Sequence, residues 1–327
     1  MSSVLLEVKG LKKYFPVKTS LFSFKKSQRL IHAVDSVNFS IRAGETFSLV
    51  GETGCGKTTT GRLLLRLIEP TSGDVIFDGR NLFKLNKKEL RSMRRNMQMI
   101  FQDPFASLNP RVTVKDIVGL PFKIYGIAKG VEREKLVADL LEKVGLTPAS
   151  QFINRYPHEF SGGQRQRIGV ARAIALRPKF IVADEPVSSL DISVRSQILN
   201  LMQDLKSEFK LTYLLIAHDL SVIRHMSDFL AIMYLGKIVE LASSEDFFIS
   251  PQHPYAKALI AAVRVPDPSF KGQRIRLRGE IPSRINPPKG CLFNTRCPYV
   301  SHICEEQEPI LLKIKKDHFV ACHMLSR

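Results

Sequence analysis

A chain of 327 residues with 44% hydrophobic content has room for one large α/β domain and a smaller appendage. No apolar run approaches the roughly 18 residues that a membrane-spanning helix needs, and the first residues, Glu7 and Lys9 among them, lack the apolar region of a signal peptide. We therefore expect a cytoplasmic protein that does not itself cross a membrane. The net charge of +18 indicates an anionic partner, either nucleic acid or the negative face of a membrane, or else a solvated basic surface, and charge alone does not choose among them.

Residues 4 to 50 alternate and turn in the manner of an antiparallel β-layer. Residues 17 to 31 interrupt this layer with a stretch that mixes apolar and basic side chains without periodic order. We interpret this stretch as an inserted hairpin or loop outside the core, and contact with a membrane surface is the less favoured alternative.

A phosphate-binding loop follows the strand predicted at residues 46–50. Residues 51–58 read G-x-x-x-x-G-K-T, a pattern in which backbone N–H groups curl around phosphate oxygens, the lysine reaches the β- and γ-phosphates, and the threonine hydroxyl holds Mg²⁺. A helix predicted at residues 59–68 leaves the loop, so strand, loop and helix supply the context that the motif needs. We expect the Cys55 side chain to be packed and inert. The residues predicted to contact the nucleotide are Gly51, Glu52, Thr53, Gly54, Cys55, Gly56, Lys57, Thr58 and Thr59.

The middle of the chain is predicted to be mostly helical. A strand predicted at residues 97–101 delivers Gln102 to a loop, and from about residue 113 the chain reads as helices. An amphipathic pattern at residues 131–144 is the clearest of them. We predict a helical subdomain, about residues 103–178, inserted into an α/β core.

Two further strands are predicted to end in polar side chains. The apolar run at residues 179–183 leads to Asp184 and Glu185, and the run at residues 212–217 leads to His218. Alternation of strands and helices is typical of a parallel sheet whose site lies where the strands end. The predicted fold class is therefore α/β, with a P-loop NTPase core.

These residue types suit hydrolysis of ATP, a reaction that depends mainly on positioning and on neutralising phosphate charge. Thr58 and Asp184 are placed to hold Mg²⁺, directly or through water. Glu185 adds a second carboxylate, which can accept the proton of the attacking water. His218 can reach the γ-phosphate, and Gln102 can ligate Mg²⁺ or the attacking water. The predicted catalytic residues are Glu185, His218 and Gln102.

A second motif is much rarer than the phosphate loop. Residues 160–167 read F-S-G-G-Q-R-Q-R, and with the motifs above they resemble the full motif set of the ATP-binding cassette (ABC) ATPases. The resemblance implies a head-to-tail dimer, in which the signature of one subunit caps the γ-phosphate held by the phosphate loop of the other. It also implies that Phe15 stacks on the adenine, with Tyr14 adjacent, and that Asp191 lies at the dimer seam. The signature residues implied in this way are Ser161, Gly162, Gly163 and Gln164.

Three stretches are similar to the ATP-binding subunits of bacterial oligopeptide, dipeptide and nickel importers: residues 101–110 (FQDPFASLNP), residues 251–255 (PQHPY) and the cysteine-bearing tail. The insertion at residues 17–31 resembles that of the F-type subunit. This resemblance implies an ATP-binding and ATP-hydrolysing subunit that energises import of di- or oligopeptides, peripheral at the cytoplasmic face of the plasma membrane. It leaves nickel, heme and sugars open as transported substrates.

The same resemblance implies partners and a domain organisation. A D-type ATPase subunit is the expected other half of a heterodimer, with a homodimer as the alternative, and two permease subunits and an extracytoplasmic solute-binding protein complete the importer. An ABC nucleotide-binding domain at residues 1–258 contains an antiparallel β-subdomain and the helical subdomain. Residues 259–327 follow as a linker and a small Cys-rich C-terminal extension.

Four of the five cysteines lie in the last forty residues. Clustered cysteines in a reducing compartment indicate metal binding rather than disulfides, and four thiolates suit either a [4Fe–4S] cluster or structural zinc. The lack of a C-x₂-C pair argues against zinc, and the related importer ATPases associate this tail with an iron–sulfur cluster, so we prefer the cluster. His302 and His323 are interpreted as bystanders. The predicted ligands are Cys291, Cys297, Cys304 and Cys322.

Two other classes of function compete with the importer. A soluble ABC ATPase that acts on nucleic acid or ribosomes would also explain the charge. Such proteins usually carry two cassettes, a long coiled coil, or cysteine pairs between the phosphate loop and the signature, and this sequence shows none of these features. A regulatory subunit without catalysis is disfavoured because every catalytic position is filled. We therefore expect no nucleic-acid partner.

Overall fold

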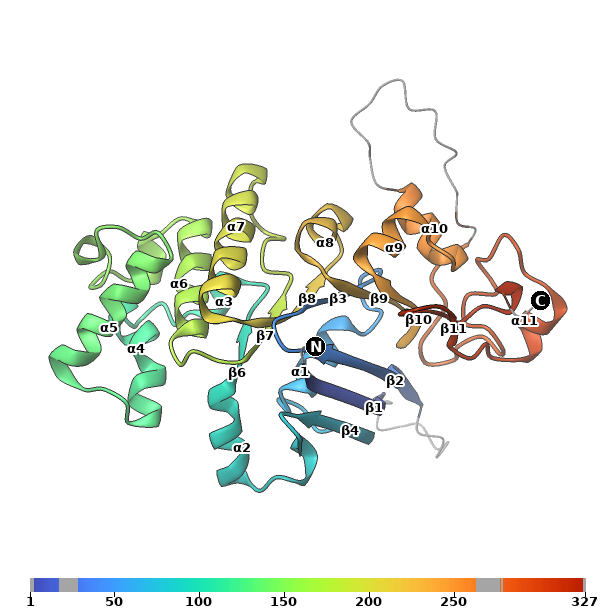
Figure 1. Ribbon diagram of the computed structural model, residues 1–327, viewed down its shortest axis with the longest axis horizontal. Helices are drawn as coiled ribbons and strands as arrows, with labels where there is room; N and C mark the ends of the chain where they lie inside the picture. The colour runs from blue at the N-terminus through green and yellow to red at the C-terminus, as the bar shows by residue number, and fades with distance from the viewer. Residues whose placement is uncertain (1–2, 18–28, 263–276, 278, 326–327) are drawn as a thin grey trace, which may run out of the picture. The chain divides into compact units, whose positions relative to one another are not determined.

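The computed structural model describes most of the chain, namely residues 3–17, 29–262, 277 and 279–325 (Figure 1). These residues form two compact units. The helical unit comprises residues 43–45 and 85–216. The phosphate-loop unit comprises residues 3–42, residues 46–84 and the described residues from 217 onward.

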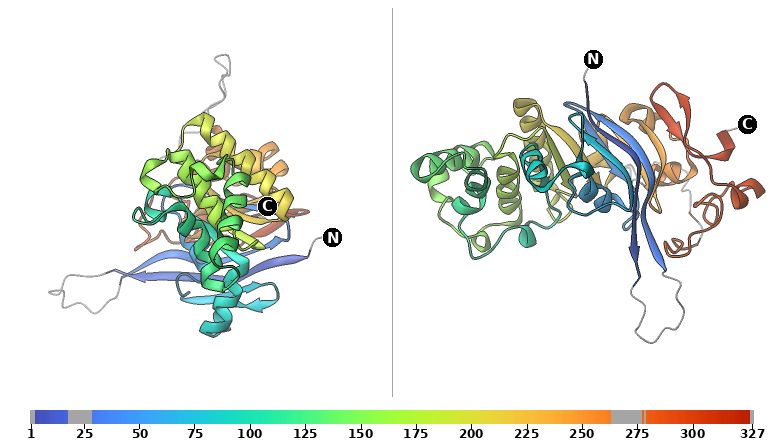
Figure 2. Two further views of the ribbon diagram at one scale, coloured as in Figure 1. Left: turned by 90° about the vertical axis from the view of Figure 1, so that its left-hand side faces the viewer. Right: turned by 90° about the horizontal axis from the view of Figure 1, so that it is seen from below.

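An antiparallel β-layer opens the phosphate-loop unit, as the sequence predicts. Its strands pair in the order β2-β1-β4-β5, and they are β1 (Val4–Pro16), β2 (Leu30–Arg42), β4 (Ser72–Phe77) and β5 (Arg80–Asn81). Figure 2 shows β1 and β2 as two long strands side by side. Alternate residues face the core because successive side chains of a strand point to opposite faces: Leu6 and Val8 on β1, and Val37, Phe39 and Ile41 on β2, are buried.

The insertion predicted at residues 17–31 is shorter than expected. The Val17 N–H donates to the Arg29 carbonyl at 2.9 Å, and Leu30 already begins β2. The antiparallel pairing of β1 and β2 therefore continues into both ends of the predicted stretch. Residues 18–28, which make up most of it, lie outside the described residues.

A second sheet of the phosphate-loop unit has the strand order β11-β12-β10-β9-β3. Its strands are β3 (Thr46–Val50), β9 (Phe229–Tyr234), β10 (Lys237–Ser243), β11 (Leu312–Lys315) and β12 (His318–Val320). β3 pairs with β9 in parallel and the remaining pairs are antiparallel. All five residues of β3 are buried, which explains the uninterrupted apolar and small side chains of this strand. The tail of the chain thus supplies the last two strands of this sheet.

Short helices complete the phosphate-loop unit. They are α1 (Lys57–Leu64), α8 (Leu220–Met226), α9 (Ser244–Ile249), α10 (Pro254–Ala261) and α11 (His302–Glu306), with 3₁₀ turns η1 (Leu82–Lys84) and η5 (His323–Leu325). The helix predicted at residues 59–68 ends earlier than expected, because Arg66 takes a left-handed backbone with φ of +47° that a helix cannot continue. In the described part of the chain, no helix combines the length and the apolar character that crossing a membrane requires.

The helical unit contains the predicted helical region and three parallel strands in the order β8-β7-β6. The strands are β6 (Met97–Ile100), β7 (Phe180–Asp184) and β8 (Thr212–Ala217). The helices are α2 (Lys87–Met93), α3 (Pro104–Ser107), α4 (Val114–Tyr125), α5 (Gly130–Lys143), α6 (Gly162–Ile174) and α7 (Ile192–Phe209), with 3₁₀ turns η2 (Arg94–Asn96), η3 (Ala149–Gln151) and η4 (Pro157–Glu159). Side chains of Asn86, Asp103, Thr113 and Ser161 accept backbone N–H groups at the starts of α2, α3, α4 and α6, which explains where these helices begin.

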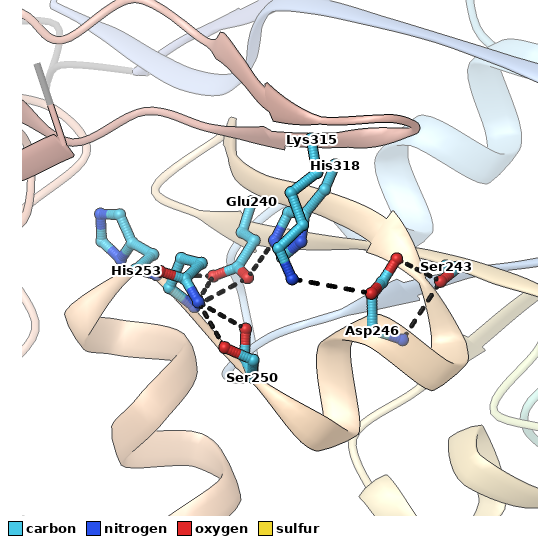
Figure 3. Close-up of polar contacts among 8 residues, drawn as sticks. Glu240, Ser243, Asp246, Ser250, His253, Lys315 and His318 are labelled. Atoms are coloured by element: carbon cyan, nitrogen blue, oxygen red, sulfur yellow. Dashed lines mark hydrogen bonds and ion pairs between the residues drawn. The ribbon is translucent and has the colours of Figure 1, made fainter.

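A buried carboxylate fastens the tail strand β12 to β10 (Figure 3). The side chains of Glu240 on β10 and His318 on β12 are fully buried, and Oε1 of the glutamate lies 2.8 Å from Nε2 of the histidine. The same carboxylate accepts the backbone N–H groups of Gln252 at 3.0 Å and His253 at 2.7 Å. Glu240 therefore joins β10, β12 and the start of α10 in one hydrogen-bonded group.

His253 begins α10 as a neutral ring. Its Nδ1 accepts the Tyr255 N–H at 3.1 Å, which requires this nitrogen to carry no proton. Burial, with the nearby Lys257 ammonium adding to it, lowers the pKa of His253 from 6.5 to about 3. The P-Q-H-P-Y stretch of the sequence is thus a helix start whose cap is a buried imidazole.

Candidate nucleotide site

The phosphate loop has a backbone that needs glycine at two positions. Gly51 has φ of +152° and Gly56 has φ of +116°, values that other residues rarely adopt. A Cβ on Gly51 would lie 2.3 Å from the Met233 carbonyl oxygen, and a Cβ on Gly56 would lie 2.2 Å from the Ala33 carbonyl oxygen. The loop is therefore packed against the backbones of β9 and β2, which fix its shape.

Lys57 places its ammonium inside the loop. Nζ donates to the carbonyl oxygens of Gly51 at 2.7 Å and Glu52 at 3.1 Å, and the residue is only 5% exposed. Cys55 is equally buried, and burial raises the pKa of its thiol, so it stays protonated at neutral pH. This environment supports the expectation that Cys55 is packed and inert.

The start of α1 favours an anion. Gly56 is the N-cap residue of α1, and no side-chain hydrogen bond caps this helix start. The partial positive charge of a helix N-terminus attracts phosphate. Thr58 and Thr59 lie in this first turn and are partly exposed.

Three residues far along the chain contact the loop and were not predicted from the sequence. The Arg296 guanidinium donates to both carboxylate oxygens of Glu52, at 2.9 and 3.0 Å. The Tyr255 hydroxyl accepts the Glu52 N–H at 2.9 Å. Arg284 lies so close to Gly54 that a Cβ there would be 3.0 Å from its Nη2. The signal available in the sequence was Glu52 itself, an acidic side chain in a loop that binds anions.

The helical unit carries the predicted acids at the end of β7. Asp184 is its last residue and is 3% exposed, and Glu185 follows with φ of +45°. Gln102, just after β6, donates from Nε2 to Oε2 of Glu185 at 2.9 Å. The Glu185 N–H donates to the Ile216 carbonyl on β8 at 2.9 Å. Gln102 and Glu185, predicted separately, therefore meet at the ends of adjacent parallel strands.

The signature begins α6 as a capping box. The Ser161 hydroxyl accepts the Gln164 N–H at 3.3 Å, and the Gln164 side-chain oxygen accepts the Ser161 N–H at 3.0 Å. Gly163 is required by packing rather than by backbone conformation, because a Cβ there would lie 2.4 Å from Cγ1 of Val194 on α7. Gly162 has more room, with its nearest neighbour at 3.5 Å. Packing therefore requires glycine at position 163 but not at position 162.

The remaining predicted residues lie at the ends of elements. Asp191 is the N-cap of α7 and is exposed. His218 is also exposed; it comes directly after the last residue of β8 and belongs to the phosphate-loop unit. The Tyr14 hydroxyl donates to Asp35 at 2.6 Å, so this side chain is engaged within the β-layer. Phe15 points to the other face of β1, with a neighbouring lysine ammonium 4.9 Å from its ring centroid.

The tail cysteines are all free of disulfides and lie within electrostatic range of one another. Burial raises the pKa of Cys291 to about 11 and also raises those of Cys297 and Cys322, and the neighbouring thiols add to the effect. Among the residues that the structure describes, no group of three or more His, Cys, Asp or Glu side chains is arranged to hold a metal ion. The arrangement of the described side chains therefore does not support the predicted iron–sulfur or zinc site.

Parallel strands that end in acids, a phosphate loop at a helix start and a capped signature helix together define an ABC ATPase. Comparison with known protein families agrees. The family model described as ABC transporter matches residues 34–188, and the model described as oligopeptide/dipeptide transporter, C-terminal region, matches residues 239–304.

Close relatives match over nearly the whole chain. The oligopeptide transport ATP-binding protein AppF of Bacillus subtilis (strain 168) is 51% identical over 325 residues, which cover 98% of each chain. The probable peptide ABC transporter ATP-binding protein y4tS of Sinorhizobium fredii (strain NBRC 101917 / NGR234) is 48% identical over 324 residues, 99% of this chain and 91% of that protein. The chain belongs to the oligopeptide/dipeptide branch of the ABC transporter ATP-binding proteins, which confirms the resemblance of its motifs.

A solved structure confirms the cassette fold. It is a dimeric ATP-binding cassette in a post-hydrolysis state bound to ADP and Pi. It matches with a TM-score of 0.65 and 29% identity, and the match covers 73% of this chain and 99% of that one. The cassette fold therefore accounts for about three quarters of the chain.

Proposed function

We propose that this chain is the ATP-binding and ATP-hydrolysing subunit of a membrane importer of di- or oligopeptides. The observation that carries the proposal is the hydrogen bond between Gln102 and Glu185, directly after Asp184. This bond joins the side chain proposed to bind the attacking water, Gln102, to the side chain proposed to accept its proton, Glu185. The chain also fills every other position of the ABC motif set. The relatives AppF and y4tS, both named for peptide transport, support peptides as the cargo.

ATP is proposed to bind with its phosphates in the loop at residues 51–59 and its adenine on Phe15. Mg²⁺ would be held by Thr58, Asp184 and Gln102, since hydroxyl, carboxylate and amide oxygens are the ligands that this cation prefers. The amide oxygen of Gln102 remains available for this role because its contact with Glu185 is made through the nitrogen. When bound, Mg²⁺ neutralises charge on the phosphates.

In the proposed reaction, a water oxygen forms a bond to the γ-phosphorus while the bond from this phosphorus to the β–γ bridging oxygen breaks. Glu185 accepts the proton of the water. His218 contacts the γ-phosphate, and Lys57 offsets the negative charge that develops on the departing ADP. The products are ADP and phosphate.

The proposed active state is a head-to-tail dimer. Ser161, Gly162, Gly163 and Gln164 would cap the γ-phosphate of ATP held by the partner's loop, and Asp191 would lie at the seam. The dimeric state of the solved cassette supports this arrangement. We propose a D-type ATPase subunit as the partner, a homodimer being the alternative, with two permease subunits and an extracytoplasmic solute-binding protein. The complex would place this chain at the cytoplasmic face of the membrane.

We further propose that residues 1–258 are the nucleotide-binding domain and that residues 259–327 carry the linker and a thiol-bound metal centre. We prefer a [4Fe–4S] cluster to zinc as this centre. Two observations support thiol ligation. The four tail cysteines form no disulfide, and three of them, Cys291, Cys297 and Cys322, accept a backbone N–H from two residues further on. Protein purified without oxygen should contain iron and acid-labile sulfide, and stoichiometric zinc alone would reverse the choice of metal.

Reconstitution tests the function as a whole. This chain, its D-type partner and the permease subunits are assembled in proteoliposomes with the solute-binding protein and a mixture of di- and oligopeptides. Peptide should stimulate phosphate release and should accumulate in the compartment opposite the solute-binding protein. ATP hydrolysis that DNA or ribosomes stimulate without the permease would favour the nucleic-acid alternative instead.

A further inference from the structure

Glu52 is an acidic side chain at the second position of a loop that accepts the most anionic part of ATP. A carboxylate near the phosphates raises the free energy of the bound state, because like charges repel most strongly where water is scarce. The loop's own lysine makes no described hydrogen bond or ion pair with this carboxylate. Among its described contacts, Lys57 donates to carbonyl oxygens of the loop and not to the Glu52 carboxylate.

Arg296 of the tail offsets the negative charge of the Glu52 carboxylate. Its guanidinium makes two parallel hydrogen bonds to the carboxylate, from Nη1 to Oε2 at 2.9 Å and from Nη2 to Oε1 at 3.0 Å. This fork geometry is specific to arginine and is stronger than a single ion pair. The arginine side chain is 8% exposed and the glutamate side chain 27% exposed, so solvent screens the pair only weakly.

The turn that carries Arg296 is held in place by aromatic packing. Phe293, 1% exposed, makes an edge contact with Tyr234 at 5.2 Å between ring centroids and packs on Tyr255 at 5.5 Å. The Cys297 N–H donates to the Phe293 carbonyl at 2.9 Å and closes the turn. Tyr255 in addition accepts the Glu52 N–H. Glu52 is therefore fixed through both its backbone and its side chain by residues that follow the cassette motifs in the sequence.

We infer that Arg296 is a positioning residue for the phosphate loop: it neutralises Glu52 and holds it in one orientation, and the cysteine-bearing tail thereby sets the affinity of the loop for ATP. The inference rests on the proposed ATP site. Arg296 acts through Glu52 and touches no reacting atom. Loss of the arginine leaves an unpaired carboxylate in the loop, whereas loss of both charges leaves none, and this difference separates the inference from a purely structural role.

The test compares the wild type with a single and a double variant of the full-length protein. Calorimetric titration with the Mg²⁺ complex of AMP-PNP measures affinity, and steady-state phosphate release measures KM and kcat. Arg296→Gln should weaken binding by about tenfold or more and raise KM in parallel, with kcat within about twofold, because the free energy lost belongs to binding. Adding Glu52→Gln to Arg296→Gln should recover at least about threefold of the affinity that the single variant loses. Equal binding by Arg296→Gln and wild type, or a double variant as weak as the single one, would overturn the inference.

Two further variants keep the test decisive. Arg296→Lys keeps the charge but loses the fork, and its affinity should fall by about two- to fivefold; a folded Lys variant with wild-type affinity would also count against the inference. Lys315→Gln removes another cation of the tail, one in an exposed ion pair with Asp246, and should leave affinity unchanged. Wild-type protein that fails to bind AMP-PNP would refute the proposed function rather than the role of Arg296.

Discussion

Glu185 has a backbone conformation that glycine adopts more readily. Its φ of +45° lies in the left-handed region, where a residue with a Cβ is strained by about 1–3 kcal/mol. The backbone is held there by hydrogen bonds, from its N–H to Ile216 and from the Ser188 N–H and hydroxyl to its carbonyl. The strained conformation aims the carboxylate at Gln102. A glutamate kept at such a position indicates that its side chain is needed.

The first prediction concerns Glu185→Gln. The amide keeps the size of the side chain and its capacity to bond Gln102, but it cannot accept a proton from water. We expect ATP hydrolysis to fall by about 100-fold or more while the affinity for Mg²⁺-AMP-PNP stays within about threefold. Phosphate release and calorimetry measure the two. Glu208→Gln, at an exposed ion pair with Lys143, is the control, and near-normal turnover in Glu185→Gln would remove the glutamate from the chemistry.

The Val194 side chain on α7 occupies the space that a side chain at Gly163 on α6 would need. The constraint is steric, since a Cβ at this position would meet Val194 at 2.4 Å while the backbone itself is ordinary. An added methyl group must displace the Val194 side chain or the helix that carries it. The signature glycine therefore serves the packing of the helical unit as well as the proposed contact with ATP.

A paired substitution separates these two roles. Gly163→Ala should lower the free energy of unfolding by about 1–3 kcal/mol because of overpacking, and adding Val194→Ala should restore most of it. Urea unfolding followed by circular dichroism measures both. If the double variant regains stability but not ATPase activity in the assembled importer, the glycine is needed at the dimer interface. Gly163→Ala with unchanged stability would show that α7 yields to the added methyl group.

The strand pair β10 and β12 depends on one buried carboxylate. Glu240→Ala removes the partner of the His318 ring and the acceptor for the N–H groups of Gln252 and His253, and His253 and His318 are buried. We expect the free energy of unfolding to fall by about 3 kcal/mol or more. Lys315→Gln, which breaks an exposed ion pair in the same region, should cost less than about 1 kcal/mol. Equal losses in the two variants would contradict the role of Glu240.

Stability of the whole phosphate-loop unit should depend on pH through His253. Its pKa is about 3 in the folded protein and 6.5 in the reference state, so above pH 6.5 the ring is neutral in both states. As pH falls from 6.5 toward 3, the unfolded chain takes up a proton that the folded chain does not. The free energy of unfolding therefore decreases, by up to about 1.4 kcal/mol per pH unit.

Comparison with His253→Asn isolates this contribution, because asparagine can cap α10 without titrating in this range. Urea unfolding of both proteins at several pH values between 4 and 7 measures it. The difference in stability between wild type and variant should shrink as the solution becomes more acidic. A difference that stays constant over this range would mean that the buried imidazole is not the titrating group.

The elements of the whole molecule were predictable where their causes are local. Apolar runs predicted β3, β7 and β8, and the G-x-x-x-x-G-K-T pattern predicted the phosphate loop. The C-terminus of α1 was misplaced because the left-handed backbone of Arg66 has no residue signature. The pair of Glu52 and Arg296 could not be predicted, because 244 residues separate its members and only the tertiary fold brings them together. The spacing of the cysteines likewise does not predict their burial, which raises the pKa of Cys291, Cys297 and Cys322.

The tail strands β11 and β12 also determine which strand forms the open edge of the sheet. Without them β10 would be an outer strand, and its row of N–H and C=O groups could recruit a strand from another chain. β12 covers that row through the pairs Glu240 with Val320 and Leu241 with Phe319. β11 then becomes the outermost strand, and it presents exposed Lys313 and Lys315, charged side chains that discourage strand addition. The tail thus makes this end of the sheet resistant to aggregation.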